Sequence, residues 1–300
     1  MFVYSCFGQT INAAELVEEE KMDGDLIKLE PFGGVLRDLY DAVTAPLRET
    51  DTPITVADVR VGVFYSAVKL SSGHAGMAYT PSEELPLDHS ARHAYMRRAG
   101  RLRDMSVEEL ARLAFSDNLL ESAVGLAAIN ALAELQYSRG LPSGTRNVAG
   151  VDALELLNVR SEETVTMIGA FPFFIKQLRG KVAGLHVTER NPAAYSGYPL
   201  VPAAEQESAL TAADVVLVTA SALVNHTLDG ILPLCGRARE IAIVGPTTPL
   251  LPEPFFRHGV TLVGGTHLSD GDMVLRVVGE GGTGGHLWAG GAEKVNLVRA

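Results

Sequence analysis

The chain has 300 residues, of which 47% are hydrophobic and 20% are charged. At about 150 residues per domain this length predicts about two domains, and the composition excludes a disordered or collagen-like chain. Lys and Arg number 25 against 36 Asp and Glu, a net charge of −11, which excludes general binding to nucleic acid or to an anionic membrane surface.

Cysteine content and hydropathy predict a cytoplasmic location. Cys6 and Cys235 are too few for a disulfide framework or a cysteine-based metal site. No apolar run approaches the length of about 18 residues that a membrane span needs, and no basic region precedes the first apolar residues. We therefore expect a small-molecule ligand and neither a membrane nor a nucleic-acid partner. A homo-oligomer is compatible with the sequence.

The first half of the chain predicts a mixed unit of helices and strands. Apolar residues recur at helical spacing over 35–48. Residues 54–80 are rich in β-branched side chains around the turn cluster SSGHAG, which predicts a small antiparallel meander. A capping-box pattern at Ser106 and Glu109 precedes a helix, and a longer helix follows over about 118–137. The segment LPSGTRNVAG that comes next is typical of a linker.

From residue 164 the pattern changes to short apolar strands separated by helical segments. Such strands are typical of a parallel sheet that is covered on both faces. The sequence thus predicts an α/β protein with a C-terminal Rossmann-like domain. The glycine-rich segment GEGGTGGHLWAGG near the end predicts irregular backbone. The five predicted strands are 164–169, 182–189, 214–221, 240–246 and 260–265.

Ligands of open parallel sheets bind beyond the carboxyl ends of the strands. Gly169 ends the first strand and Glu189 the second, and their separation, 189 − 169 = 20, is the spacing at which a carboxylate accepts hydrogen bonds from ribose hydroxyls. Phe171 and Pro172 stand where a dinucleotide fingerprint has glycines. This argues against NAD or FAD and favours a nucleoside without a pyrophosphate. A charged strand end with no ligand carries about equal weight for Glu189.

Polar residues and glycines follow the later strands as well. Ser221 ends the third strand, and Asn225 or Thr227 would cap the helix predicted in LDGILPL, whose free N–H groups could receive an anion. Capping without a ligand is the favoured interpretation. Segments 245–247 and 264–265 end the fourth and fifth strands, and their glycines would allow close approach of the backbone to a ligand.

Four side chains are candidate acids or bases. His74 lies within the GHAG turn, Lys69 and Tyr79 flank it, and His226 follows the third strand. A simple hairpin turn explains the glycines equally well. In the long helix, Asn130 lies on an apolar stripe, where a hydrogen-bonded core asparagine is the favoured interpretation.

Residues with the spacing of metal ligands are scarce. His89 and His93 stand four apart beside Asp88, so on a helix they would share one face. Nearby arginines favour a solvated basic helix there, or a segment that recognises one acidic group. We expect no bound metal. These arginines are Arg92, Arg97, Arg98, Arg101 and Arg103.

The chain resembles one family in a series of ordered motifs: VRVGVFYSAVKLSSGHAGMAYT, LLESAVGLAAINAL, TVTMIGAFPFFIKQLRG, LHVTERNP, ADVVLVTASALVNHTLDGIL, IAIVGPTTPLLP and GVTLVGGTHLSD. It is the uncharacterised family labelled "putative heavy-metal chelation", which joins an enolase-N-terminal-like domain to a Rossmann-like domain. The resemblance implies a site where the two domains meet. We therefore divide the chain into an α+β enolase-N-terminal-like domain (1–105), a helical connection that packs on both domains (106–160) and the Rossmann-like domain (161–300).

The resemblance also implies which residues line this site. His226 and the arginine-rich segment are less typical of the family, which suggests that this protein has a substrate that differs from those of other members. The residues that match the family motifs are Gly76, Asn118, Asn130, Gly169, Phe171, Glu189, Asn191, Asn225, Thr227, Gly245, Pro246 and Thr247.

Three functions are compatible with these observations. The first is an enzyme that binds an adenosyl compound, with S-adenosylmethionine as the best candidate, and places its ribose on Glu189. A sulfonium is activated by its own charge, so positioning and one base would suffice for alkyl transfer, or for cyclisation or elimination within the ligand. The amino-acid end would lie near 225–227 or in the first domain. The alternatives are a protein that chelates a heavy metal or metallophore, and a ligand sensor without chemistry.

Overall fold

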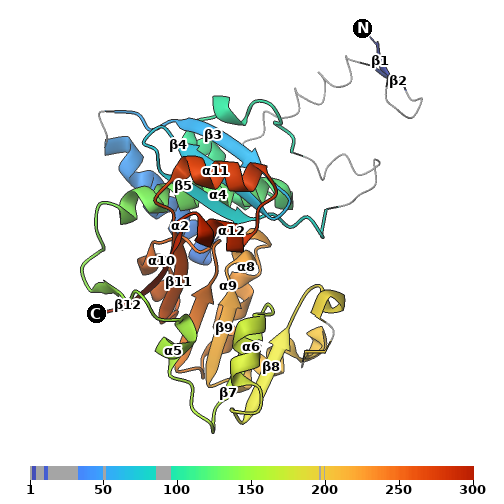
Figure 1. The fold of residues 1–300 in the computed structure, drawn as a ribbon, viewed down its shortest axis with the longest axis vertical. Helices are drawn as coiled ribbons and strands as arrows, with labels where there is room; N and C mark the ends of the chain where they lie inside the picture. The colour runs from blue at the N-terminus through green and yellow to red at the C-terminus, as the bar shows by residue number, and fades with distance from the viewer. Residues whose placement is uncertain are drawn as a thin grey trace.

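The computed structural model describes residues 2–4, 10–12, 33–49, 52–85, 96–195, 197–198 and 200–300. It is a mixed α/β protein with a seven-stranded, mostly parallel sheet below a three-stranded antiparallel sheet (Figure 1). The predicted fold class is therefore confirmed. Two further strands, β1 (Phe2–Tyr4) and β2 (Thr10–Asn12), pair with each other. Cys6 and the predicted segment with Asp88, His89 and His93 lie outside the described residues.

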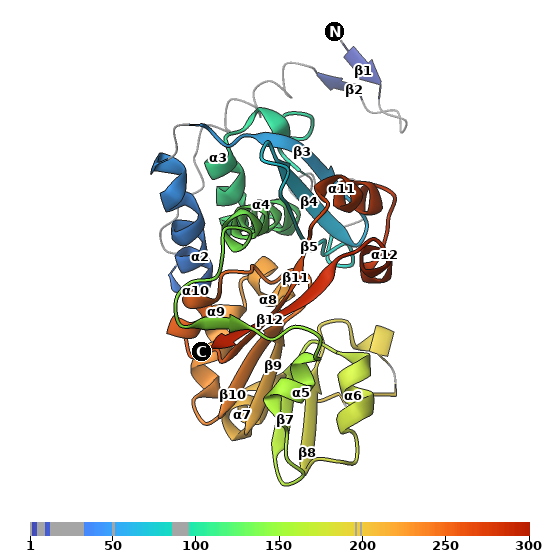
Figure 2. The same cartoon turned by 60° about the vertical axis from the view of Figure 1, so that its left-hand side comes forward.

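The three-stranded sheet forms the centre of the upper layer. Its strands β3 (Val56–Val61), β4 (Tyr65–Leu70) and β5 (Ala75–Tyr79) pair antiparallel in chain order, which confirms the meander. Helix α4 (Leu119–Tyr137) packs on one face of this sheet and α11 (Gly271–Gly279) on the other (Figure 2). The other helices here are α2 (Gly34–Thr44), η1 (Ala45–Glu49), η3 (Leu102–Asp104), α3 (Val107–Arg112), η4 (Leu113–Phe115) and α12 (Gly284–Ala289).

Side-chain caps start two of these helices, and the first of them is the predicted capping box. The Ser106 hydroxyl accepts the Glu109 N–H at 3.2 Å, and the Glu109 carboxylate accepts the Ser106 N–H at 2.9 Å, which completes the capping box of α3. At the start of α4 the side-chain oxygen of Asn118 accepts the N–H groups of Leu120 and Glu121. These bonds satisfy donors that have no partner inside a helix.

The lower sheet has the strand order β6-β12-β11-β10-β9-β7-β8. The five predicted strands are confirmed, and all five are parallel; β8 lies on one side of β7, while β9, β10 and β11 continue on the other. They are β7 (Thr164–Ile168), β8 (Gly184–Thr188), β9 (Val215–Thr219), β10 (Glu240–Val244) and β11 (Leu262–His267). The helices along them are α5 (Ala153–Leu157), α6 (Pro172–Leu178), η5 (Pro192–Tyr195), η6 (Ala203–Glu205), α7 (Gln206–Ala212), α8 (Ser221–Val224), α9 (Leu228–Ile231), η7 (Leu232–Cys235) and α10 (Pro252–Arg257).

Two sequence expectations are wrong. The expected linker contains β6 (Thr145–Asn147), which pairs antiparallel with β12 (Glu293–Arg299), a strand that we did not predict. The glycine-rich segment is not irregular throughout, because it contains α12. A cap at Thr283 and the buried side chain of Leu287 stabilise this helix despite its glycines.

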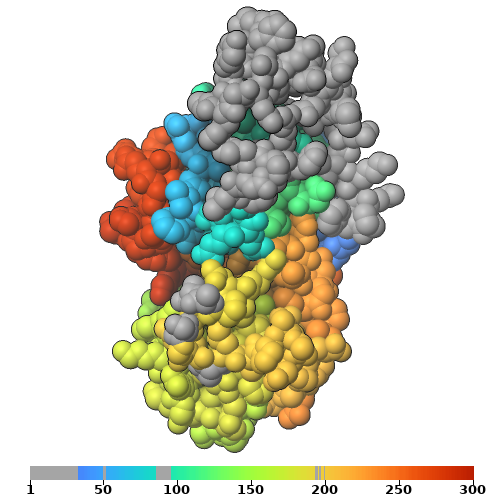
Figure 3. Space-filling view, turned by 90° about the vertical axis from the view of Figure 1, so that its right-hand side faces the viewer, coloured from blue at the N-terminus to red at the C-terminus, as the bar shows by residue number. Residues whose placement is uncertain are grey.

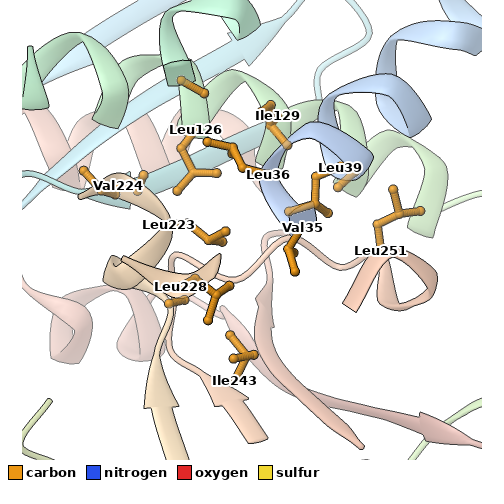
Figure 4. Close-up of a cluster of buried hydrophobic side chains, with 14 of the residues drawn as sticks. Val35, Leu36, Leu39, Leu126, Ile129, Leu223, Val224, Leu228, Ile243 and Leu251 are labelled. Atoms are coloured by element: carbon orange, nitrogen blue, oxygen red, sulfur yellow. The ribbon is translucent and has the colours of Figure 1, made fainter. Parts of the chain in front are cut away.

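One hydrophobic core joins the two layers (Figure 4). It combines side chains of α2 and α4 with those of α8 and α9 and with one face of the large sheet, where Val216 and Ile243 are fully buried. Val215 and Leu217 alternate with these positions and pack with α5 and α6 on the other face. Helix α11 follows the last parallel strand but packs on the upper sheet, so the chain crosses between the layers more than once. In the described part of the chain no helix is long and apolar enough to cross a bilayer.

We predict that Gly125→Ala destabilises the protein although alanine is the better helix former by about 1 kcal/mol. A Cβ at residue 125 of α4 would lie 1.9 Å from the Ala114 backbone nitrogen, and backbone cannot move aside cheaply. We expect a loss of about 1–3 kcal/mol or more in urea unfolding. Gly230→Ala in α9 is the matched control, because nothing lies within 4 Å of its Cβ position. Equal effects of the two substitutions would contradict the packing argument.

We also predict a pH-dependent loss of stability in Glu163→Gln. The Arg239 guanidinium donates to both oxygens of this buried carboxylate, at 2.6 and 2.9 Å, and lowers the pKa of Glu163 to about 2. Above the ordinary pKa of a glutamate, the free energy of unfolding of the wild type should therefore exceed that of the variant by about 1.5–3 kcal/mol. This difference should disappear as the pH falls towards 2. Urea unfolding of both proteins from neutral to acid pH measures it. The control is Glu162→Gln, at an exposed position, which should be as stable as the wild type at every pH.

Candidate functional site

Helix α4 lies across helix α8, which follows β9, and across the carboxyl ends of the next two strands of the large sheet. The Ser122 hydroxyl donates to the Val224 carbonyl, after β9, at 2.8 Å. The Asn130 amide donates to the Thr247 carbonyl, after β10, at 2.9 Å. Glu134 bonds to His267 at the end of β11, at 2.5 Å. These side chains are eight and four residues apart on α4, so about 12 and 6 Å along the axis, and they follow the strand order.

The next two strands, β7 and β8, end in the residues singled out for nucleoside binding. Gly169 follows β7 with φ +90°, and a Cβ there would lie 2.7 Å from the Thr219 methyl group at the end of β9. Glycine thus lets β7 and β9 end close together. β7 and β9 flank the point where the strand order reverses, which is where ligands of such sheets bind.

Glu189 follows β8 beside this point. One of its carboxylate oxygens accepts the Ala170 N–H at 2.8 Å and the other accepts the Asn191 N–H at 3.2 Å. These two bonds hold the carboxylate against the loop after β7. A carboxylate has about four acceptor positions, so it retains capacity for two ribose hydroxyls.

The upper layer faces this end of the sheet with tyrosine and carboxylate side chains. Tyr79 ends β5, and its N–H donates to the Thr247 hydroxyl at 2.9 Å. The carboxylate of Glu83 accepts from the Asn191 side chain at 2.6 Å. In the space-filling view, the cyan surface of the upper layer meets the yellow surface of the lower layer along this boundary (Figure 3).

Burial and negative charge determine the protonation of Tyr79. Burial raises its pKa, and the nearby carboxylates of Glu83, Glu84 and Glu189 raise it further, to about 12. The phenol therefore keeps its proton at neutral pH, so it can donate a hydrogen bond but is poorly suited to act as a base. The same influences raise the pKa of Tyr195, where burial has the largest effect, followed by Glu189 and Glu83.

The structure does not bring the four candidate acids and bases together. Lys69 is ion-paired with Asp272 at 2.5 Å on the side of the upper sheet that faces α11. The Nδ1 atom of His74 lies 3.1 Å from the Ser72 hydroxyl at the hairpin turn. That turn and Tyr79 lie at opposite ends of β5, about 14 Å apart along the strand. Burial lowers the pKa of His74, as do the charges of Arg139 and His267.

The region after β9 differs from its prediction. The Nε2 atom of His226 lies 2.8 Å from the Ala114 carbonyl, and the residue has φ +59°. Thr227 forms no side-chain cap on α9; its hydroxyl donates to the Asn225 side-chain oxygen at 2.7 Å. The predicted cap is therefore wrong, because Asn225 already engages the Thr227 hydroxyl. Ser221 shares a hydrogen bond of 2.7 Å with Thr219.

Three residues implied by the family resemblance have partners within the fold. Gly76 allows β5 to contact α4, since a Cβ there would lie 2.1 Å from the Ala131 nitrogen. Asn118 caps α4. Asn130 donates to Met77 of β5 at 2.7 Å as well as to Thr247, as expected of a hydrogen-bonded core asparagine.

Aromatic and glycine residues complete the edge. Phe171 stacks on Phe174 with ring centroids 5.6 Å apart, while Phe173 is 63% exposed. Gly245 has φ +129° in the turn after β10, where its N–H donates to the Gly264 carbonyl at 3.0 Å. Pro246 follows it in the same turn. The glycine is thus needed for the backbone conformation.

Sequence reasoning missed Glu83, Tyr195 and the pair of Glu134 with His267. Glu83 stands in the polar segment PSEELP, which is typical of a surface turn, so no local signal marks it. Glu134 is nearly fully buried, and burial raises its pKa while His267 opposes the rise. A glutamate on an otherwise apolar helix face is the signal that could have found this pair. Within the described residues, no group of three or more His, Cys, Asp or Glu could hold a metal ion.

Comparison with known proteins gives matches over most of the chain. Two family models match residues 46–133 and 152–297, and both carry the description "Putative heavy-metal chelation". An uncharacterized protein of Methanocaldococcus jannaschii is 26% identical over 250 residues, which are 80% of this chain and 89% of the relative.

Two solved structures have a similar fold. The crystal structure of a protein with unknown function from Pyrococcus horikoshii is 23% identical, with a TM-score of 0.71 over 89% of this chain and 100% of that one. A second protein with unknown function, from Desulfitobacterium hafniense, is 21% identical, with a TM-score of 0.66 over 88% and 98%. Both are assigned to the family whose model matches residues 152–297.

We predict that Asn130→Leu destabilises the protein by about 1–3 kcal/mol for each carbonyl left unpaired. The substitution removes the donors to Met77 and Thr247 at similar side-chain size. Asn130→Asp keeps the shape but places a carboxylate against two carbonyl oxygens, so it should cost at least as much in urea unfolding. An Asp variant as stable as wild type would show that shape, rather than hydrogen bonding, matters here.

Proposed function

The chain belongs to the family described as "Putative heavy-metal chelation", and on that premise we propose that it is an enzyme that binds S-adenosylmethionine between its two layers. The reaction would be alkyl transfer, or cyclisation or elimination within the ligand. The single observation that carries the proposal is the position of Glu189, at the end of the strand next to β7 and held against the loop after Gly169.

In this proposal the ribose lies on Glu189 and the adenosyl group over the ends of β7 and β9. A carboxylate after the second strand accepts hydrogen bonds from ribose hydroxyls in nucleotide-binding sheets. Gly169, whose φ is positive, lets β7 end directly against Thr219 of β9, where a Cβ would clash with the threonine methyl group. Of the two phenylalanines nearby, Phe173 is 63% exposed and Phe171 stacks on Phe174.

The charges around Glu189 favour a cationic ligand. Glu83, like Glu189, raises the pKa of both Tyr79 and Tyr195, so both tyrosines lie within the electrostatic influence of these two carboxylates, whereas Glu84 is paired with Arg190. S-adenosylmethionine carries a sulfonium and an ammonium group, and both are attracted by carboxylates and by the faces of aromatic rings. The net charge of −11 acts in the same direction.

The chemistry needs little from the protein beyond positioning. In alkyl transfer, a nucleophile forms a bond to a carbon next to sulfur while the C–S bond breaks, and its electron pair passes to sulfur to give a neutral thioether. In cyclisation the nucleophile is the ligand's own amine, which loses a proton. Holding the reacting atoms in line supplies most of the acceleration. Protonated Tyr79 would orient the ligand as a hydrogen-bond donor.

We predict that metal-stripped protein binds S-adenosylmethionine or its demethylated product in isothermal titration calorimetry. Glu189→Ala should weaken binding by about 1.5–3 kcal/mol, the range for hydrogen bonds to a charged group. Glu162→Ala is the matched control, since this exposed glutamate precedes β7 at the opposite end of the strand. A thermal melt of each variant separates loss of binding from loss of folding.

Other results of these binding experiments would favour one of the alternative functions. No heat with either ligand contradicts the proposal. Stoichiometric binding of a divalent ion that is lost on changing Glu189 or His226 would favour chelation. If the ligand binds and mass spectrometry finds it unchanged after long incubation, a sensor is favoured over an enzyme.

A further inference from the structure

The segment Pro81–Leu85, here called the strap, connects the upper layer to the end of β8. It follows β5 directly and makes two contacts with residues after β8. The Glu83 carboxylate accepts from the Asn191 side chain at 2.6 Å. The Glu84 carboxylate pairs with the Arg190 guanidinium at 2.6 Å.

The start of the strap is fixed by buried hydrogen bonds. Thr80 is 2% exposed, and its hydroxyl bonds to the Ser66 hydroxyl at 2.9 Å. Its N–H donates to the Phe64 carbonyl at 3.0 Å. Buried bonds of this kind are costly to break, because the separated groups have no water to replace the partner. Thr80 is therefore a fixed point at one end of the strap.

The contacts with β8 are of a different kind. The Glu84 and Arg190 side chains are 27% and 57% exposed, and Glu83 is exposed as well. The contact of Glu84 with Arg190 is an exposed ion pair, and such pairs contribute little to stability and are screened by salt. The contact of Glu83 is a single hydrogen bond from the neutral Asn191 amide. The strap is thus firmly held at Thr80 and weakly held where it reaches β8.

The weak contacts lie beside the proposed ribose carboxylate. Asn191 bonds to Glu83 through its side chain and donates its backbone N–H to Glu189. Arg190 stands between Glu189 and Asn191 in the chain. When the two contacts break, the strap can move away from Glu189 without disturbing any buried bond of Thr80.

We propose that the strap is a salt-sensitive gate over the Glu189 end of the site, which opens by release of Glu83 from Asn191 and of Glu84 from Arg190. Ligand enters and leaves on this side, since α4 occupies the ends of β10 and β11. The identity of that ligand rests on the proposed function, whereas the opening of the strap does not.

The test is hydrogen–deuterium exchange of the full chain without ligand, at about 0.05 M and about 0.5 M NaCl. In wild type, high salt should speed exchange in 82–85 and 189–191 by about threefold, as expected for the loss of an exposed pair. Glu83→Ala/Glu84→Ala should exchange at the faster rate at both salt concentrations. Arg190→Ala breaks the Glu84 contact from the other side and should also exchange faster.

The matched control is Glu155→Ala/Glu162→Ala, which removes the same charge from exposed positions away from the strap. Exchange in these peptides that does not respond to salt, or that is equal in the strap and control variants, would overturn the gate. In stopped flow, Arg190→Ala should also bind S-adenosylmethionine about threefold faster than wild type. Unchanged association would contradict entry past the strap. If the ligand gives no signal, the exchange result still decides the gate, and the proposed function fails separately.

Discussion

The buried helix α4 is the constraint on which the arrangement of both layers depends. Every residue from Leu120 to Leu135 is buried, and a helix that is apolar on all sides is stable only within a core. Its few polar side chains would be costly there without partners. Ser122, Asn130 and Glu134 find those partners in α8 and at the ends of β10 and β11. The same bonds that satisfy the helix thus fix the upper layer on the large sheet.

The position of α4 also limits where a ligand can bind. With the ends of β10 and β11 occupied, those of β7, β8 and β9 remain, and the strand order reverses between β7 and β9. The two ends of β5 differ in charge. His74 lies near Arg139 and His267 at one end, whereas Tyr79 lies near Glu83 and Glu189 at the other. The carboxylates therefore gather at the Tyr79 end of β5, beside the end of β8.

The sequence correctly predicted those helices and strands whose signals come from residues that are neighbours in the chain. The capping box at Ser106, the meander and the five parallel strands all follow from residues adjacent in the chain. The segment 145–147 became a strand because β12 supplies its hydrogen bonds from about 150 residues away in the chain. A glycine-rich composition likewise concealed α12, which depends on burial of Leu287 against α11 and the upper sheet.

For the candidate site, local sequence patterns predicted that Gly169 and Glu189 lie at one edge of the sheet, because the carboxyl ends of parallel strands meet there and the twenty-residue spacing is measured along the chain. The two ends of β5 lie in different surroundings, which neighbouring residues in the chain do not reveal. The sequence therefore could not show that Tyr79, rather than Lys69 or His74, lies beside Glu189. It gave no sign of Glu83, which reaches Asn191 from a separate layer. Contacts between distant segments depend on how the layers pack, and here the partners of α4 decided that packing.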